Sequence, residues 1–297
     1  MTTKKILCPV DFSSGSRCAM RTAIRLANER GAELELVHAW SLPTVGFAGG
    51  YSYAPDVVTL LSDDAQAGLT EAVAQATALG AKRVTPRLVS GVPWQQIVDL
   101  AADPAYELIV IGSHGRTGLG RVLIGSVAEL VVRHAPCPVL TVRGDGEALP
   151  YRHVLCPVDF SPSSRAAVEL ASQLVQPGGA GVTLLYVLEL PVAWGEVRPF
   201  DVYGDLDRRG RALLEGWVKE LGARLAVPVG LQARVGSAGA QVLAAIDDDP
   251  TIDLVAMGSH GYTGLKRLAL GSVAEKTVRH ARCPVLVARG RGTTGQP

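Results

Sequence analysis

Two copies of one glycine-rich stretch decide the fold of this chain: I-G-S-H-G-R-T-G-L-G-R-V-L-I-G-S-V at residues 111–127 and M-G-S-H-G-Y-T-G-L-K-R-L-A-L-G-S-V at residues 257–273. Each copy follows a short apolar run, which is typical of a buried parallel strand. Each also precedes a helical pattern that begins near Ser126 or Ser272. The sequence therefore predicts, twice, a glycine-rich loop between the carboxyl end of a strand and the amino end of a helix.

A loop in that position favours an anion, because the first N–H groups of the helix are unpaired and the helix dipole is positive there. We expect Ser126 and Ser272 to cap the helices and to donate a hydroxyl to the same anion. The alternative is a pair of tight turns without a ligand, since the spacing is neither that of a P-loop nor that of a dinucleotide fingerprint. The glycines would let the backbone approach a phosphate or take a positive φ: Gly112, Gly115, Gly125, Gly258, Gly261 and Gly271.

The whole chain is an internal duplication. I-L-C-P-V-D-F-S at residues 6–13 returns as V-L-C-P-V-D-F-S at residues 154–161, and V-R-H-A-P-C-P-V returns as V-R-H-A-R-C-P-V. A repeat of this length indicates tandem domains and not a solenoid. We predict two homologous domains, residues 1–146 and 147–297, joined by the polar linker G-D-G-E.

Strands alternate with helices in each half, which favours an α/β fold with a parallel sheet covered on both faces. Right-handed crossovers make such a sheet doubly wound and place its ligand at the carboxyl ends of the strands. Residues 40–62, rich in glycine and proline, are expected to form a loop or lid before a helix at 63–79, and residues 188–206 take their place in the second half. The other expected elements of the first half are strands at 5–10, 34–39, 84–89, 108–111 and 138–142, and helices that begin at Trp94 and near Ser126. A further helix is expected between a cap at Ser13 or Ser14 and an end at Gly31.

Composition excludes several classes of protein. Of 297 residues, 47% are hydrophobic and 19% charged, which suits a folded core and not a disordered chain. The net charge of +1 provides no electrostatic surface for nucleic acid or an anionic membrane. No apolar run approaches the roughly 18 residues of a membrane span, and the first residues do not resemble a signal peptide. We expect a cytoplasmic protein.

Neither cysteine nor histidine indicates a metal site. The five cysteines contain no C-x-x-C pair, and Cys8 and Cys137 recur at equivalent places as Cys156 and Cys283. Duplication explains that pattern, so we expect reduced residues near strand ends, with a disulfide or metal site as the alternative. The histidines lack the spacing of three or four zinc ligands, and His134 and His280 are expected to complement a helix dipole.

Asp11 and Asp159 end the first expected strand of each half, in P-V-D-F-S. One interpretation is that each carboxylate caps the following helix. The other is that it faces the crevice above the glycine loop, at the switch point between the first and fourth strands. Because a carboxylate repels phosphates, it would then accept hydrogen bonds from the ribose or the base.

The spacing G-2x-G-9x-G-S, present without departure in both halves, resembles the nucleotide-binding signature of the ATP-binding branch of the universal stress protein family. The resemblance implies a strand order of 3-2-1-4-5 and one ATP site per domain, with or without Mg. It also implies contact through the last strands, so the two halves would pair as a pseudo-two-fold dimer. A homodimer of the whole chain stays open.

The same resemblance places Pro9 and Pro157 beside the base and Val187 against it, with Ala39 as a smaller contact in the first half. His114 and His260 either reach phosphate or only pack against the loop, and Arg121 and Arg267 either contact phosphate or are solvated. The predicted nucleotide-binding residues are Pro9, Asp11, Ala39, Ile111, Gly112, Gly115, Gly125, Ser126, Val127, Pro157, Asp159, Val187, Met257, Gly258, Gly261, Gly271, Ser272 and Val273.

Catalytic machinery is not evident in the sequence. The matched residues form no Ser-His-Asp arrangement, no Walker lysine and no paired carboxylates for two metals. We therefore expect a nucleotide-dependent regulator with a protein partner that the sequence does not identify. The alternatives are a slow ATPase or nucleotidyl-transferring enzyme, and an interaction module that no longer holds nucleotide.

Overall fold

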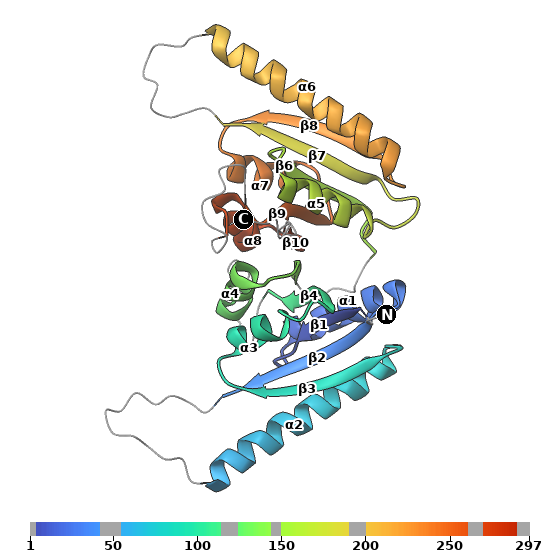
Figure 1. Cartoon of the computed structure of the whole chain (residues 1–297), viewed down its shortest axis with the longest axis vertical. Coiled ribbons are helices and arrows are strands. Elements are labelled where there is room, and N and C mark those ends of the chain that lie inside the picture. Colours follow the sequence, from blue (N-terminus) through green and yellow to red (C-terminus); the bar gives the residue numbers. More distant parts are fainter. Residues whose placement is uncertain are drawn as a thin grey trace, which may run out of the picture. The chain divides into compact units, whose positions relative to one another are not determined.

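The computed structural model describes residues 4–41, 55–113, 124–143, 150–189, 200–260 and 270–289. The chain divides into two compact units, residues 1–149 (unit 1) and residues 150–297 (unit 2). Figure 1 shows the same alternation of strands and helices in each unit. The predicted linker G-D-G-E lies outside the described residues. No helix among the described residues is long and apolar enough to cross a membrane.

Unit 1 is a doubly wound α/β fold whose described strands are all parallel and ordered β3-β2-β1-β4-β5 (Figure 1). Right-handed crossovers place α1 and α2 on one face and α3 and α4 on the other, and each pair of helices is in contact. The elements are β1 (Lys5–Pro9), α1 (Ser14–Arg30), β2 (Glu33–Trp40), α2 (Pro55–Ala78), β3 (Val84–Ser90), α3 (Pro93–Leu100), β4 (Tyr106–Gly112), α4 (Ser126–His134) and β5 (Val139–Val142).

Unit 2 repeats this order as β8-β7-β6-β9-β10, again parallel. The predicted sheet order is confirmed in both units. The pseudo-two-fold pairing of the units stays a prediction. The elements are β6 (His153–Val158), α5 (Pro162–Ser172), β7 (Gly181–Leu188), α6 (Phe200–Arg224), β8 (Val229–Val235), α7 (Ala238–Asp248), β9 (Leu254–Gly258), α8 (Ser272–His280) and β10 (Val285–Ala288).

Helix α1 shows how local sequence sets an element. The Ser13 side chain accepts a hydrogen bond from the Ser16 backbone N–H, which caps the helix. Gly31 ends the helix with a φ of 62°, a left-handed conformation that costs glycine little. Both ends agree with the sequence prediction.

The prediction of a loop as far as residue 62 is wrong. Helix α2 already begins at Pro55, and in unit 2 helix α6 begins at Phe200, inside the segment 188–206. Proline is favourable at the first helical position because the N–H that it lacks would have no intrahelical partner there. The first turns of α2 carry apolar residues at helical spacing (Val57, Val58, Leu60 and Leu61), yet they are weakly buried, and the Leu60 side chain is 69% exposed.

Candidate functional site

The carboxyl ends of β1, β2 and β4 border a cavity of about 280 Å³ in unit 1. Pro93 and Ile97 of α3 and the first residues of α4 line it from the other side. It therefore lies where strand order reverses between β1 and β4, the place where doubly wound folds bind ligands.

Eight of the residues predicted for the first half line this one cavity, although they come from separate parts of the chain. They are Pro9, Asp11, Ala39, Ile111, Gly112, Gly125, Ser126 and Val127. The ninth, Gly115, lies outside the described residues, as do His114, Arg116 and Arg121. The fold thus gathers strand ends and a helix start into a single concave surface.

The carboxylate of Asp11 is held by the residue that caps α1. Its Oδ1 accepts hydrogen bonds from the Ser13 backbone N–H at 3.1 Å and the Ser13 hydroxyl at 2.6 Å. Asp159 makes the same two bonds to Ser161 in unit 2. Asp11 therefore holds the capping residue Ser13 and does not cap α1 itself, and it also lines the cavity.

Phe12 and Phe160 follow these aspartates with φ values of 66° and 63°. A non-glycine residue with positive φ is strained and is found mainly where the surrounding structure imposes it, often near a functional site. The strain turns the chain sharply between the strand and the capping serine, which directs Asp11 and Phe12 into different cavities. The sequence did not indicate this conformation.

The described loop glycines do not take the positive φ that the sequence offered as one possibility, and two of them have a packing role. Among the described glycines with positive φ, none belongs to the two glycine-rich loops. A Cβ on Gly112 would lie 2.7 Å from the carbonyl oxygen of Gly15, and one on Gly258 would lie 2.8 Å from Ser163 Oγ. These two glycines are therefore required for close packing of the strand end against α1 or α5.

Ser126 and Ser272 do not cap their helices, contrary to the prediction. The N-cap residues are Gly125 and Gly271, with no side-chain cap, and the serines are the first helical residues. Without a side-chain cap, N–H groups of the first turn stay available to an anion. Each loop is closed at its base by a backbone hydrogen bond, Gly125 N to Ser113 O at 2.7 Å and Gly271 N to Ser259 O at 2.8 Å.

The predicted residues of the second half occupy the equivalent places in unit 2. They lie at the ends of β6, β7 and β9 and at the start of α8: Pro157, Asp159, Val187, Met257, Gly258, Gly271, Ser272 and Val273. Gly261, Tyr262, Lys266 and Arg267 lie outside the described residues. The geometry of the strand ends and helix start is thus duplicated along with the sequence.

One contact distinguishes the two units. Ser163 Oγ donates to the carbonyl oxygen of His260 at 2.6 Å and lies 2.9 Å from Ser161 Oγ. The side chain of His260 also contacts Ser259, with Nδ1 2.9 Å from the hydroxyl oxygen. Gly15 stands in place of Ser163 in unit 1, and glycine has no side chain to make such a bond. The start of the glycine-rich loop is therefore anchored to the preceding helix in unit 2 in a way that unit 1 does not share.

Sequence reasoning missed several residues of the cavity, and His38 is the most polar of them. Its Nδ1 lies 2.7 Å from the Val10 carbonyl oxygen, which can only accept, so Nδ1 carries the proton. Its ring lies 4.4 Å from that of Phe12. Tyr186 takes this place in unit 2, and the substitution of one aromatic residue for another was the only signal in the sequence.

The structure places four cysteines in or near strands, as expected (Cys8, Cys137, Cys156 and Cys283), and Cys18 within helix α1. All five cysteines are buried and form no disulfide, and burial raises the pKa of the Cys8 and Cys156 thiols well above the ordinary range. His134 and His280 are the last residues of α4 and α8. No group of three or more metal-binding side chains exists among the described residues.

Similarity to known proteins identifies the family of the chain. The model of the universal stress protein family matches it twice, over residues 2–143 and 150–289. The chain belongs to the universal stress protein family. The crystal structure of a universal stress protein from Archaeoglobus fulgidus shares its fold, with a TM-score of 0.71 and 23% identity over 97% of this chain and 99% of that one.

Relatives within the universal stress protein family match different shares of the chain, from about one unit to nearly the whole length. A universal stress protein of Mycolicibacterium smegmatis is 29% identical over 300 residues, covering 96% of this chain and 97% of that protein. One from Mycobacterium tuberculosis is 33% identical over 226 residues, 71% of this chain and 72% of its own length. Another, from Methanocaldococcus jannaschii, is 38% identical over 141 residues, 47% of this chain and 82% of its own length. The tandem arrangement is therefore shared within the family.

Proposed function

We propose that each unit of this universal stress protein binds one ATP, with or without Mg, and that the bound nucleotide regulates a protein partner. The observation that supports this proposal best is the single cavity of unit 1. It brings together eight residues predicted for nucleotide binding from four separate segments. A mixture of apolar walls and few polar groups is typical of a small-molecule site.

The cavity offers different chemistry at its two ends. The uncapped start of α4, with Ser126 beside it, provides N–H and hydroxyl donors for phosphate. Asp11, at the end of β1, provides an acceptor for ribose hydroxyls, and Pro9 and Ala39 provide apolar contacts for a base. Such a distribution matches a nucleotide whose phosphates point toward α4.

Binding without efficient turnover follows from the same residues. Phosphoryl transfer requires charge neutralisation at the γ-phosphate and an oriented nucleophile. Asp11, the carboxylate that lines the cavity, is engaged by Ser13 and lies at the nucleoside end of the proposed pose. We expect phosphate release of ~10⁻³ s⁻¹ or slower, as in a poor intrinsic GTPase. Turnover at roughly 1 s⁻¹ would favour the enzymatic alternative.

Calorimetric titration with Mg-ATP tests the proposal, and we expect two sites per chain. Gly115→Glu and Gly261→Glu should each remove one site, because they place a negative charge where phosphate would lie. Asp11→Asn keeps the side-chain oxygen that accepts hydrogen bonds from Ser13 but removes the negative charge. It should weaken ATP binding in unit 1 about tenfold or more. Asp63→Asn, at an exposed position of α2, is the matched control.

Identification of the small molecules released on denaturation provides the second measurement. Recovery of an adenine nucleotide supports the proposal. Two results together would reject it in favour of an interaction module: no released nucleotide after mild purification, and no thermal shift on adding ATP. A stoichiometry that both glutamate variants leave unchanged would exclude the glycine-rich loops as the sites.

A further inference from the structure

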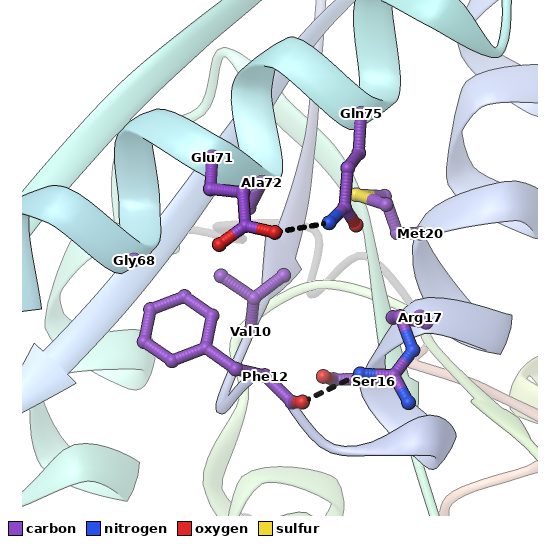
Figure 2. A pocket seen from close by; sticks show the side chains of 9 residues that line it. All are labelled: Val10, Phe12, Ser16, Arg17, Met20, Gly68, Glu71, Ala72 and Gln75. Carbon is purple, nitrogen blue, oxygen red and sulfur yellow. Dashed lines mark hydrogen bonds between the residues drawn. The ribbon is translucent and has the colours of Figure 1, made fainter.

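Unit 1 contains a second cavity, of about 230 Å³, between α1 and α2. Figure 2 shows Glu71 and Gln75 of α2 on one side of it and Phe12 and Arg17 on the other. Apolar side chains supply much of the remaining lining, among them Met20. The strained backbone of Phe12 places its ring here, one residue after Asp11, which lines the proposed nucleotide cavity.

The duplication of the chain locates the matching place in unit 2. The capping serines Ser13 and Ser161 set an offset of 148 residues (161 minus 13) for α1 and α5. The fully buried Leu69 and Leu214 set an offset of 145 (214 minus 69) for α2 and α6. The resulting equivalent pairs are Phe12 with Phe160, Arg17 with Arg165, Glu71 with Gly216, Ala72 with Trp217, and Gln75 with Glu220.

In unit 2 this place is occupied by the protein's own side chains. The indole of Trp217 packs edge-on against Phe160, with ring centroids 5.4 Å apart. The guanidinium of Arg165 lies over that indole, 4.6 Å from its centroid. Arg165 also forms a two-pronged ion pair with Glu220, at 2.6 and 3.0 Å. An aromatic ring and a carboxylate therefore both contact one arginine.

Unit 1 keeps the equivalents of Phe160 and Arg165 but has neither the indole nor the carboxylate that contact the arginine in unit 2. Ala72 supplies no ring, and Gln75 supplies no charge. Arg17 donates one hydrogen bond to the Phe12 carbonyl oxygen at 2.8 Å, and a guanidinium has five N–H donors in total. The carboxylate of Glu71, which accepts from Gln75 at 3.0 Å, adds a negative charge where unit 2 has a glycine.

We propose that this cavity binds a free aromatic amino acid. The ring lies where Trp217 lies in unit 2, the carboxylate contacts Arg17 as Glu220 contacts Arg165, and the ammonium group faces Glu71. A cavity of about 150 Å³ holds a benzene molecule, so this one has room for a larger ring. Arginine both stacks on aromatic faces and pairs with carboxylates. One positive and one negative side chain in the lining match a zwitterion better than an ion of either sign.

Val10 and Ser16 line both cavities, but the inference does not depend on the proposed nucleotide function, because the side chains assigned to the ligand line only this cavity: Phe12, Arg17, Glu71 and Ala72. It is tested on the full chain with 5-fluoro-L-tryptophan, followed by fluorine NMR. We expect saturable broadening of the ligand signal that unlabelled L-tryptophan reverses. No saturable binding at millimolar ligand, the affinity range expected of so small a ligand, would overturn the proposal.

Two variants show whether binding occurs in this cavity. Ala72→Trp reproduces the unit 2 occupant and should abolish binding, whereas Ala74→Trp, on an exposed position of the same helix, should leave it unchanged. Glu71→Gln alters only an exposed side chain and should weaken the binding of L-tryptophan several-fold. The affinity for indole-3-propionate, which has no ammonium group, should stay the same or increase. The assignment would be overturned if Ala72→Trp still bound the ligand, or if Glu71→Gln left the affinity for L-tryptophan unchanged.

Discussion

Ser163 Oγ donates a 2.6 Å hydrogen bond to the carbonyl oxygen of His260, which joins the start of α5 to the start of the second glycine-rich loop. Gly15 occupies the equivalent position of unit 1 and makes no such bond. A loop held before its ligand arrives loses less conformational entropy on binding. The anchoring of the loop start therefore differs between the two units of this universal stress protein, and we predict that their proposed sites differ in preorganisation although the loops share one sequence signature.

Ser163→Ala should lower the free energy of unfolding by about 1 kcal/mol through loss of this hydrogen bond. It should also weaken ATP binding in unit 2, measured by calorimetry in the Gly115→Glu background, where only the second proposed site remains. Ser14→Ala, at an exposed position of unit 1, is the control. Unchanged affinity in the Ser163 variant would show that the bond does not prepare the loop.

Gly112→Ala should destabilise the protein by about 1–3 kcal/mol, because the added Cβ would lie 2.7 Å from the backbone oxygen of Gly15. The midpoint of urea unfolding measures the change. Gly216→Ala is the contrasting control: its Cβ meets nothing within 4 Å, and alanine in a helix is favoured over glycine by about 0.5–1 kcal/mol. If Gly112→Ala were as stable as the native chain, the packing role of this glycine would be wrong.

Glu35 should make unit 1 sensitive to acid. Its buried carboxylate accepts from Arg87 Nε at 2.9 Å, Tyr106 OH at 2.8 Å and Lys5 Nζ at 3.2 Å. Burial alone raises the pKa of Glu35, but these three hydrogen bonds outweigh it and hold the pKa below its ordinary value. The stabilisation is therefore present above the unfolded pKa of about 4.3 and is lost as pH falls through the lower folded pKa.

Glu35→Gln should cost about 1–3 kcal/mol at pH 7 and flatten the pH dependence of stability in the acid range. Urea unfolding at pH 7 and at several pH values below 5 measures both effects. Glu29→Gln, at a mostly exposed position of α1, is the matched control. An acid transition of undiminished steepness in the Glu35 variant would assign the sensitivity to other carboxylates.

Trp217→Ala should create in unit 2 a cavity equivalent to the one that Ala72 lines in unit 1. For a fully buried tryptophan, this substitution would lower the free energy of unfolding by about 3–5 kcal/mol. Since Trp217 is only half-buried, we expect a decrease of about 2 kcal/mol. Added indole should raise the melting temperature of the variant more than that of the native chain, because a ligand that binds only the folded state stabilises it. An equal shift in both proteins would mean that the side chain leaves no usable cavity.

Much of the architecture follows from the sequence alone. Alternating strand and helix patterns, and a glycine-rich loop between the fourth strand and the last helix of each half, predicted the parallel sheets. The family resemblance supplied the strand order. The capping serine before α1 and the glycine after it were also predicted, because such signals depend on neighbours within a few residues.

The exact start of α2 was not predicted. Residues 55–62 do carry apolar side chains at helical spacing (Val57, Val58, Leu60 and Leu61), but the glycines and prolines shortly before them favoured a loop. The capping role predicted for Ser126 was wrong, and the packing role of Gly112 was not foreseen. Whether a glycine serves a ligand or a neighbouring helix depends on what lies beside it, and residue 15 lies almost a hundred positions away along the chain.

The sequence by itself thus determined the duplication, the fold class and the set of strand ends and loops from which a nucleotide site would be built. Only the tertiary structure decided that these residues share one cavity, that Ser163 reaches His260, and that Trp217 fills a space which unit 1 leaves open. Local patterns report on the hydrogen bonding and burial of one element at a time. Cavities and side-chain contacts arise between elements, and their geometry is set only when the chain packs.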